Sequence, residues 1–219
     1  RAECEASLRR LEVETIDLYQ LHWPDPDAEI ELAWQTMLEL KQAGKVREIG
    51  VSNHSRSQLA RLQPIHPVAS LQPPYSLVAR EIESEILPYC GAQRIGVIVY
   101  SPMCKGLLSG SFTRERALNL PDNDHRSRDP KFRPPLLDLN LALVERLRPL
   151  AARQQRSMAE LAIAWTLRRP EVTAAIVGAR RPDQIAGVLG AAEWRLSPAD
   201  QQEIETCLAE RQAAIDRLG

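Results

Sequence analysis

Short apolar runs alternate with helical patterns along this chain. The run IDLYQLHW at 16–23 has the two-residue period of a strand. Apolar residues at the spacing of an amphipathic helix follow it, from Ile30 to Leu38. Gly44 can end this helix in a left-handed conformation, and a second apolar run, VREIGVS at 46–52, comes directly afterwards. Strand, helix and strand in this order predict a βαβ unit with parallel strands.

The same alternation continues to the end of the chain. Further strands are predicted at 68–72, 96–101 and 172–178. Helices are predicted around 58–62 and 81–89, from a capping box of Ser157 and Glu160, from Pro182, and from Ser197-Pro198 towards Leu218. Residues 101–135 follow neither period and are expected to form a large surface loop. The pattern predicts five strands alternating with helices in a single domain over 1–219.

Alternating βα units are typical of two architectures, an open doubly wound sheet and a closed barrel. The open nucleotide-binding folds carry a GxGxxG or GxxxxGK[ST] loop, and neither string occurs in this chain. The α/β class predicted is therefore the (β/α)8 or TIM-barrel type. Because a complete barrel has eight strands, we expect an incomplete barrel of about five βα units with two exposed strand edges.

Composition and charge narrow the possible functions. Lys and Arg total 28 against 29 Asp and Glu, so the formal net charge of −1 provides no broad attraction for nucleic acid or a membrane surface. No apolar run approaches the ~20 residues of a membrane helix, and the first residues lack a hydrophobic signal core, so a cytoplasmic protein is expected. Four widely spaced cysteines without a CxxC pair predict neither a metal site nor a disulfide framework.

Chemically useful side chains stand at the C-terminal ends of successive predicted strands, where barrel enzymes place their active sites. They are His22 in LHWPD, Ser52 and Asn53 in IGVSN, Gln72 in LQPPYS and Tyr100 in VIVYS. Serine, asparagine and glutamine supply hydrogen-bond donors and acceptors, and the tyrosine ring supplies a flat aromatic face. We therefore expect these side chains to meet on one surface.

These motifs, in this order, resemble the aldo-keto reductase family, and the chain is similar to the C-terminal two-thirds of an NADP(H)-dependent member. The resemblance implies that His22 is the catalytic histidine, that Ser52, Asn53 and Gln72 bind the nicotinamide carboxamide, and that Tyr100 stacks on the ring. It implies that Ser101, Pro102, Met103, Gly106 and Leu107 lie over the pyrophosphate. Gly178, Ala179, Arg180 and Gln184 in IVGARRPDQ would hold the 2′-phosphate, and Trp23 would line the substrate pocket. Arg180 and Arg181 also precede the helix start at Pro182, where guanidinium groups and backbone N–H groups can bind a phosphate.

The chain departs from the family pattern in two respects. Gly187 and Val188 stand where the family has an acidic residue and an adenine-binding asparagine. No DTAxxYG-like segment is present, so the family's catalytic Asp, Tyr and Lys are absent from this sequence, and Arg1 in first place indicates a fragment. The resemblance implies an oxidoreductase that reduces a small-molecule carbonyl, with this chain inactive by itself. The alternative is a redox-silent nucleotide-binding or regulatory subunit of the same fold, as in the potassium-channel β-subunit relatives.

Each candidate residue also has a structural interpretation. A histidine after a strand can be a structural hydrogen-bonding group, and Asn53 and Gln72 can be a turn residue and a satisfied strand-end residue. Tyr100 and Trp23 can be packing residues, and the arginine pair a solvated surface cluster. His54, His66 and His125 lack ligand spacing and are interpreted as surface or loop residues. An unrelated barrel enzyme would need a Schiff-base lysine or metal ligands at strand ends, and the sequence shows neither. Substrate and oligomeric state are left open.

Overall fold

The computed structural model describes residues 1–218. Contacts between residues divide the chain into two compact units. The first comprises 1–74, 81–99 and 170–174, and the second comprises 75–80, 100–169 and the residues from 175 on. A single domain over 1–219 stays a prediction.

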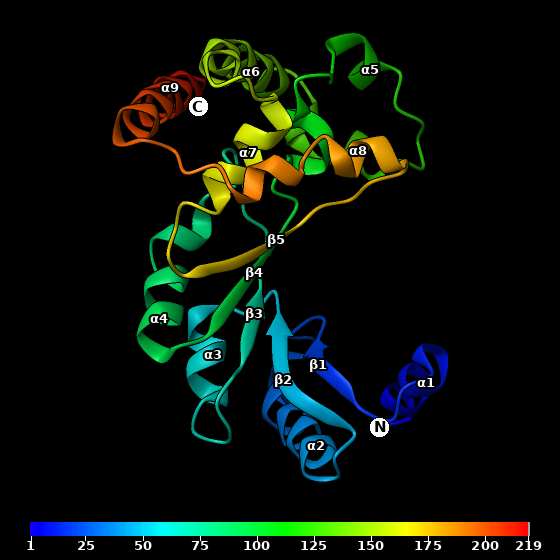
Figure 1. Ribbon diagram of the computed structural model, residues 1–219. Coiled ribbons are helices and arrows are strands. Elements are labelled where there is room, and N and C mark those ends of the chain that lie inside the picture. Colours follow the sequence, from blue (N-terminus) through cyan, green and yellow to red (C-terminus); the bar gives the residue numbers. More distant parts are fainter. Residues whose placement is uncertain (219) are drawn as a thin grey trace. The chain divides into compact units, whose positions relative to one another are not determined.

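A five-stranded sheet forms the centre of the first unit (Figure 1). Its strands are β1 (Ile16–Leu21), β2 (Val46–Ser52), β3 (Ser70–Gln72), β4 (Gly96–Tyr100) and β5 (Val172–Ile176), the last residues of β4 and β5 being assigned to the second unit. The strand order is β1-β2-β3-β4-β5, and the pairs β1–β2, β2–β3 and β3–β4 are parallel. Strands that follow one another in sequence are sheet neighbours throughout. This is the order of a βα barrel, whereas doubly wound sheets reverse their strand order at a switch point. The predicted alternation is confirmed, and five strands are consistent with an incomplete barrel.

Some of the helices begin at a capping serine or threonine. The first unit has α1 (Ala2–Leu11), α2 (Ile30–Gln42), α3 (Arg56–Leu62) and α4 (Ile86–Gln93); the second has α5 (Arg114–Leu118), α6 (Leu136–Arg153), α7 (Met158–Thr166), α8 (Pro182–Ala186) and α9 (Pro198–Asp216). Those with such a cap include α3, α5, α7 and α9. In the first unit, α2, α3 and α4 flank the strands (Figure 1). The capping box of Ser157 and Glu160 is confirmed at the start of α7, and Ser197 forms one with Asp200 at the start of α9.

Burial differs sharply between strands of the sheet. In β2 the residues Ile49, Gly50, Val51 and Ser52 are all buried, as expected for a parallel strand covered on both faces. In β1 no residue is fully buried, although its sequence is largely apolar. Only one side of β1 has a strand partner, β2. The first strand is therefore an edge of the described sheet, as predicted for an incomplete barrel.

Gly50 in β2 lies too close to β3 for any side chain. An ideal Cβ at this position would be 2.2 Å from Ser70 Oγ and 2.8 Å from Ser70 O. Gly50→Ala is therefore expected to push β2 and β3 apart and to lower the free energy of unfolding by about 1–3 kcal/mol, the usual range for overpacking. Urea denaturation followed by circular dichroism measures this change. In the control Gly178→Ala, where nothing lies within 4 Å of the added Cβ, stability should hardly change; equal losses in both variants would contradict the prediction.

Residues 101–135 contain more structure than a surface loop. They form 3₁₀ helices at Cys104–Ser109, His125–Arg128 and Pro130–Phe132, together with α5. The rings of Phe112 and Phe132 are buried and meet edge to face, with centroids 5.3 Å apart. Leu107 and Leu108 are fully buried as well. The expectation of a large surface loop is wrong for these segments, because single apolar anchors spaced irregularly along the chain leave no periodic pattern.

A buried tryptophan of α7, Trp165, packs against Arg168 in the second unit. Trp165 of α7 is fully buried, and the Arg168 guanidinium lies 3.7 Å from the centroid of its ring. Arg168 also donates to the hydroxyl of Tyr75, at 2.7 Å. Arg80 pairs with Glu205 of α9, at 2.8 Å. The short segment 75–80 is thereby joined to α7 and α9.

Candidate functional site

The ends of β2 and β3 are held together by polar contacts. Ser52 and Gln72, the last residues of the two strands, are register partners. The Ser52 hydroxyl donates to the carbonyl oxygen of Gln72, at 2.7 Å, and the backbone N–H of Asn53 donates to the same oxygen, at 3.1 Å. The two strand ends are therefore fixed to each other where the following residues leave the sheet.

Asn53 connects these strand ends to β1. Its φ of 60° lies in the left-handed region, which asparagine tolerates better than most residues. Its side-chain amide donates to the carbonyl oxygen of His22, at 3.1 Å, and to Ser52 Oγ, at 3.0 Å. The structure thus brings His22, Ser52, Asn53 and Gln72 together at the C-terminal ends of β1, β2 and β3. Their roles stay predictions.

Gln20 orients the side chain of Gln72. The Gln72 amide N–H donates to Gln20 Oε1, at 2.8 Å, and Gln20 in turn donates to Ser70 Oγ, at 3.0 Å. Since the amide nitrogen of Gln72 is engaged with Gln20, its Oε1 remains available as an acceptor; the described residues provide no partner for it. Gln20 was not among the predicted site residues. The two-residue strand period could have identified Gln20, because it places Gln20 on the same face as His22.

His22 and Trp23 follow β1 and are both exposed. Their rings lie with centroids 5.7 Å apart and planes tilted by 40°. Trp23 is 58% exposed, so the interpretation of this residue as ordinary packing is not supported. The predicted role of Trp23 in lining a substrate pocket stays a prediction.

His54 is buried, and its interpretation as a surface residue is wrong. Only 2% of the residue is exposed. Its Nδ1–H donates to the carbonyl oxygen of Ser52, at 2.8 Å, so Nε2 carries the lone pair of the neutral ring. No described residue donates to Nε2. Burial lowers the pKa of His54, and the Ser52 carbonyl and the nearby charge of Asp27 only partly oppose this effect. The sequence pattern could not predict that His54 is buried, because the burial depends on the turn at Asn53 that directs the ring inward.

Acid is expected to destabilise the fold through His54. Because its pKa in the fold lies below the ordinary 6.5, the unfolded chain takes up this proton first as the pH falls. The stability that neutral His54 contributes is present above pH 6.5 and is lost as the pH falls through its folded pKa. Asp27, Glu31 and Arg61 form an ion-pair cluster on the neighbouring helices, with Asp27 at 2.8 Å from Arg61. These three groups are unchanged in the test below.

His54→Phe should therefore flatten the decline of unfolding free energy with falling pH. Urea denaturation between about pH 7.5 and pH 5 measures this slope. His125→Gln, which changes an exposed histidine in the second unit, should keep the slope of the unaltered chain. A slope unchanged by His54→Phe would show that another group causes the acid sensitivity.

Tyr100 ends β4 and is assigned to the second unit. Its carbonyl oxygen accepts from the backbone N–H of Tyr75, at 3.2 Å. Burial raises the pKa of Tyr100 above its ordinary value, so the phenol is neutral at physiological pH. Convergence of Tyr100 with His22 and the other strand-end residues stays a prediction.

The segment after Tyr100 has an unusual backbone. Ser101, Cys104, Lys105 and Gly106 all have positive φ, and the φ of 94° at Gly106 is a conformation that residues with side chains rarely adopt. Pro102 and Leu107 are buried, and Met103 is half-buried. An ion pair between Lys105 and Asp129, at 3.0 Å, ties the segment to the 3₁₀ helix at Pro130–Phe132. The segment is therefore anchored by its buried residues and by this ion pair, and its predicted role at the pyrophosphate stays a prediction.

The two arginines before α8 differ in their contacts. The Arg181 guanidinium is paired with Asp183 through two contacts of 3.0 Å. The Arg180 side chain makes no ion pair with any residue in 1–218. The backbone N–H of Arg180 donates to Gln184 Oε1, at 2.7 Å, and Gly178 and Ala179 are exposed. Of the pair grouped together by sequence, Arg180 is the better candidate for binding an anion.

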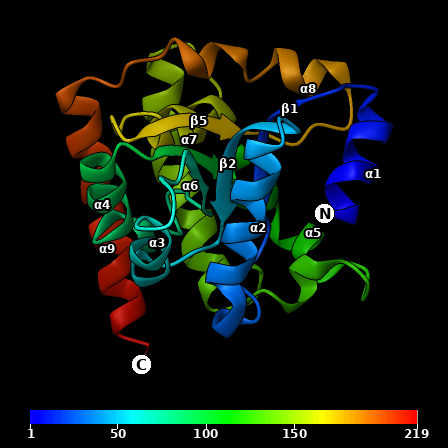
Figure 2. The ribbon, with the colours of Figure 1, turned by 90° about the horizontal axis from the view of Figure 1, so that it is seen from below.

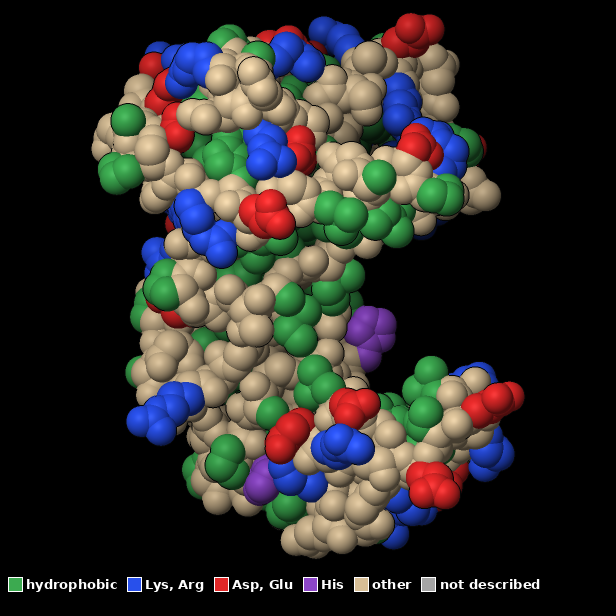
Figure 3. Space-filling view, viewed as in Figure 1, with side chains coloured by type: hydrophobic (Ala, Val, Ile, Leu, Met, Phe, Trp, Pro, Cys, Tyr) green, Lys and Arg blue, Asp and Glu red, His purple; other side chains and the backbone are tan. Residues whose placement is uncertain are grey.

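Within 1–218 no group of three or more His, Cys, Asp or Glu side chains is placed to hold a metal ion. Among the described helices none combines the length and apolar character needed to cross a membrane. On the face shown in Figure 3, basic and acidic side chains are interspersed.

The sequential parallel sheet and its polar strand ends define a protein of the (β/α)8-barrel class. The model of the aldo/keto reductase family matches residues 1–209, nearly the whole chain, and the chain belongs to this family. It is 41% identical over 207 residues to aldo-keto reductase YhdN of Bacillus subtilis, covering 94% of this chain and 62% of that protein. It is 37% identical over 204 residues to probable aldo-keto reductase 1 of Glycine max, covering 93% and 58%.

A solved structure shows the same fold. The glycerol dehydrogenase AKR11B4 from Gluconobacter oxydans matches with a TM-score of 0.90 at 39% identity, over 96% of this chain and 64% of that one. The chain therefore spans about six-tenths of the length of these relatives. The family to which this chain belongs is a family of oxidoreductases.

Proposed function

We propose that this chain is the nucleotide-binding part of an NADP(H)-dependent aldo-keto reductase, which as a whole protein reduces the carbonyl group of a small molecule to an alcohol. The observation that carries the proposal is the oriented amide of Gln72. Gln20 holds its nitrogen and leaves its Oε1 as an acceptor beside Ser52 and Asn53. Membership of the family and the reductases and dehydrogenase among the relatives support the reaction class.

The residues fit most of the proposed cofactor. A carboxamide has two N–H donors and one carbonyl acceptor, and the Gln72 Oε1 suits one N–H. The Ser52 hydroxyl and the Asn53 amide donate to Gln72, His22 and Ser52 in this structure, so to bind the remainder of the carboxamide these donors would have to turn from those partners to the nucleotide. In the second unit, the unengaged guanidinium of Arg180 suits a 2′-phosphate. Gly187 and Val188 do not fit adenine recognition, because neither side chain can form a hydrogen bond.

His22 and Trp23 serve the substrate in this proposal. NADPH supplies a hydride when bound. The exposed imidazole of His22 can donate to a carbonyl oxygen and orient it, and the exposed ring of Trp23 offers an apolar surface to the remainder of the substrate. The cytoplasm is the proposed location.

A second candidate function is a redox-silent nucleotide-binding or regulatory subunit. No DTAxxYG-like segment lies within these 219 residues, so the part of the family pattern present here is the nucleotide-binding part, which both candidates share. Nucleotide binding is common to both candidates. Turnover by the purified chain would exclude the second candidate, whereas its absence is expected under both, and both predict the same contacts at Gln72.

Gln72→Met is expected to weaken the binding of NADPH and NADH alike, by about two- to tenfold, since a neutral hydrogen bond contributes about 0.5–1.5 kcal/mol. The carboxamide is the same in both nucleotides, so the loss should not distinguish them. Isothermal titration calorimetry of the chain with each nucleotide measures it. The matched control is Gln212→Met, which removes a side-chain contact of 2.7 Å to Asp216 within α9 of the second unit. Unchanged affinity in Gln72→Met, or an equal loss in the control, would remove the support for the carboxamide site.

A further inference from the structure

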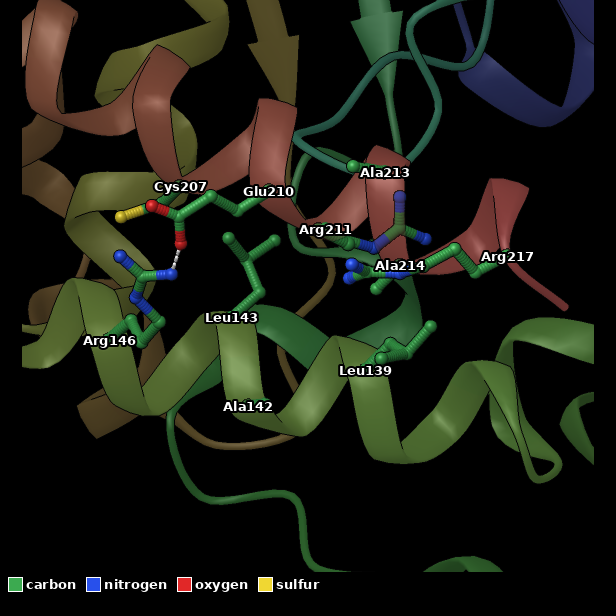
Figure 4. A pocket seen from close by; sticks show the side chains of 10 residues that line it. All are labelled: Leu139, Ala142, Leu143, Arg146, Cys207, Glu210, Arg211, Ala213, Ala214 and Arg217. Atoms are coloured by element: carbon green, nitrogen blue, oxygen red, sulfur yellow. Dashed lines mark ion pairs between the residues drawn. The ribbon is translucent and has the colours of Figure 1, made fainter.

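A cavity of about 430 Å³ lies between α6 and α9 in the second unit (Figure 4). The two helices run side by side in both ribbon views (Figure 2). Leu139 and Leu143 of α6 and Ala213 of α9 provide apolar walls, and three arginines stand along its length. The volume falls within the roughly 300–1,000 Å³ of small-molecule sites. None of these residues belongs to the strand ends or to the nucleotide motifs.

The charges around the cavity do not balance. Arg146 of α6 pairs with Glu210 of α9, and this pair has no net charge (Figure 4). The other two arginines of the lining, Arg211 and Arg217, have no carboxylate partner within the described chain. The cavity therefore has an excess of positive charge.

Part of this excess positive charge belongs to Arg211, whose surroundings disfavour the charged form. Its Nε donates to the side-chain oxygen of the fully buried Asn140, at 2.8 Å, and the Asn140 amide donates to the carbonyl of Lys131, at 2.9 Å. Asn140 is a neutral partner, and the other N–H groups of the guanidinium have no partner in the described chain. Burial lowers the pKa of Arg211, which means that its surroundings disfavour the charge. The residue is half-buried rather than fully buried, so its guanidinium is accessible to an anion in the cavity.

We propose that the cavity between α6 and α9 binds a small organic anion that has an acidic head and an apolar tail. The head is a carboxylate or a phosphate monoester, both of which match the planar fork of a guanidinium. Arg211 and Arg217 bind the head, and the tail lies against Leu139 and Leu143. The charge of the ligand offsets the unbalanced charge of Arg211.

Calorimetric titration of the chain with hexanoate, hexyl phosphate and hexanol tests the proposal. Saturable binding of at least one acid, with none for hexanol, is the expected result, and the stronger acid identifies the head group. Arg217→Met and Arg211→Gln should each weaken binding at least about tenfold, because charge-assisted hydrogen bonds are lost. Gln at position 211 keeps a donor for Asn140. The control Arg195→Met removes an exposed arginine that contacts only the Ala192 carbonyl and should bind normally.

Three results would overturn the proposal: no saturable binding of either acid, equal binding of hexanol, or unchanged binding in both cavity variants. If Arg211→Gln does not fold, Arg217→Met decides alone, since Arg217 is exposed beyond the end of α9. NADPH titrations of Arg217→Met should match those of the unaltered chain. The result is therefore independent of the proposed cofactor site.

Discussion

Purified chain 1–219 is expected to show no aldehyde reduction above background with NADPH. Reduction of a carbonyl requires a proton as well as a hydride, and a positioned general acid typically contributes about 10²–10⁴-fold in rate. The sequence has no DTAxxYG-like segment to provide that acid. Oxidation of NADPH in the presence of a nitrobenzaldehyde, followed by absorbance, measures turnover. His22→Ala is the control: turnover that disappears in this variant would contradict the prediction.

Two of the four tyrosines, Tyr75 and Tyr89, are already engaged with arginines. Tyr75 is fully buried, and its hydroxyl accepts from Arg168 at 2.7 Å. The ring of Tyr89 on α4 lies beside the guanidinium of Arg56, 5.6 Å from its centroid. Turnover in the unaltered chain would therefore require a donor other than these two residues, and it would exclude the redox-silent candidate function.

Arg180→Ala is expected to weaken NADPH binding by about 10- to 150-fold while leaving NADH almost unchanged. The reason is that hydrogen bonds to charged groups contribute about 1.5–3 kcal/mol, and only NADPH has the 2′-phosphate. Arg181→Ala is the matched control. Its guanidinium is already paired with Asp183, so this change should alter the affinity for NADPH much less. Calorimetric titration of both variants with both nucleotides gives the four affinities.

The comparison of the two arginines separates a specific contact from general charge. Both variants lose one positive charge from the same short segment, so a purely electrostatic effect would weaken NADPH equally in both. Equal losses for NADPH and NADH in Arg180→Ala would refute a role in binding the 2′-phosphate. The cofactor preference would then have to come from another part of the protein.

Much of the fold could be predicted because its signals are local. Strands such as β1 and β2 alternate with amphipathic helices, and the serine caps of α7 and α9 mark helix starts within four residues. His22, Ser52, Asn53 and Gln72 could be grouped from sequence because the C-terminal ends of successive parallel strands lie at the same edge of a sheet. In this way periodicity and capping alone determined the order of elements and one set of candidate residues.

Other features depend on contacts between distant residues, which no local pattern contains. Gln20 orients Gln72 across 52 positions of sequence, and Asn140 meets Arg211 across 71. Likewise, His54 is buried and Arg181 rather than Arg180 is ion-paired with Asp183. Both features result from how side chains pack after the elements have formed. Sequence determined which groups the chain carries and on which elements they stand. Tertiary structure alone decided which groups are buried, paired or available, because hydrogen bonding and desolvation depend on the neighbours that folding brings together.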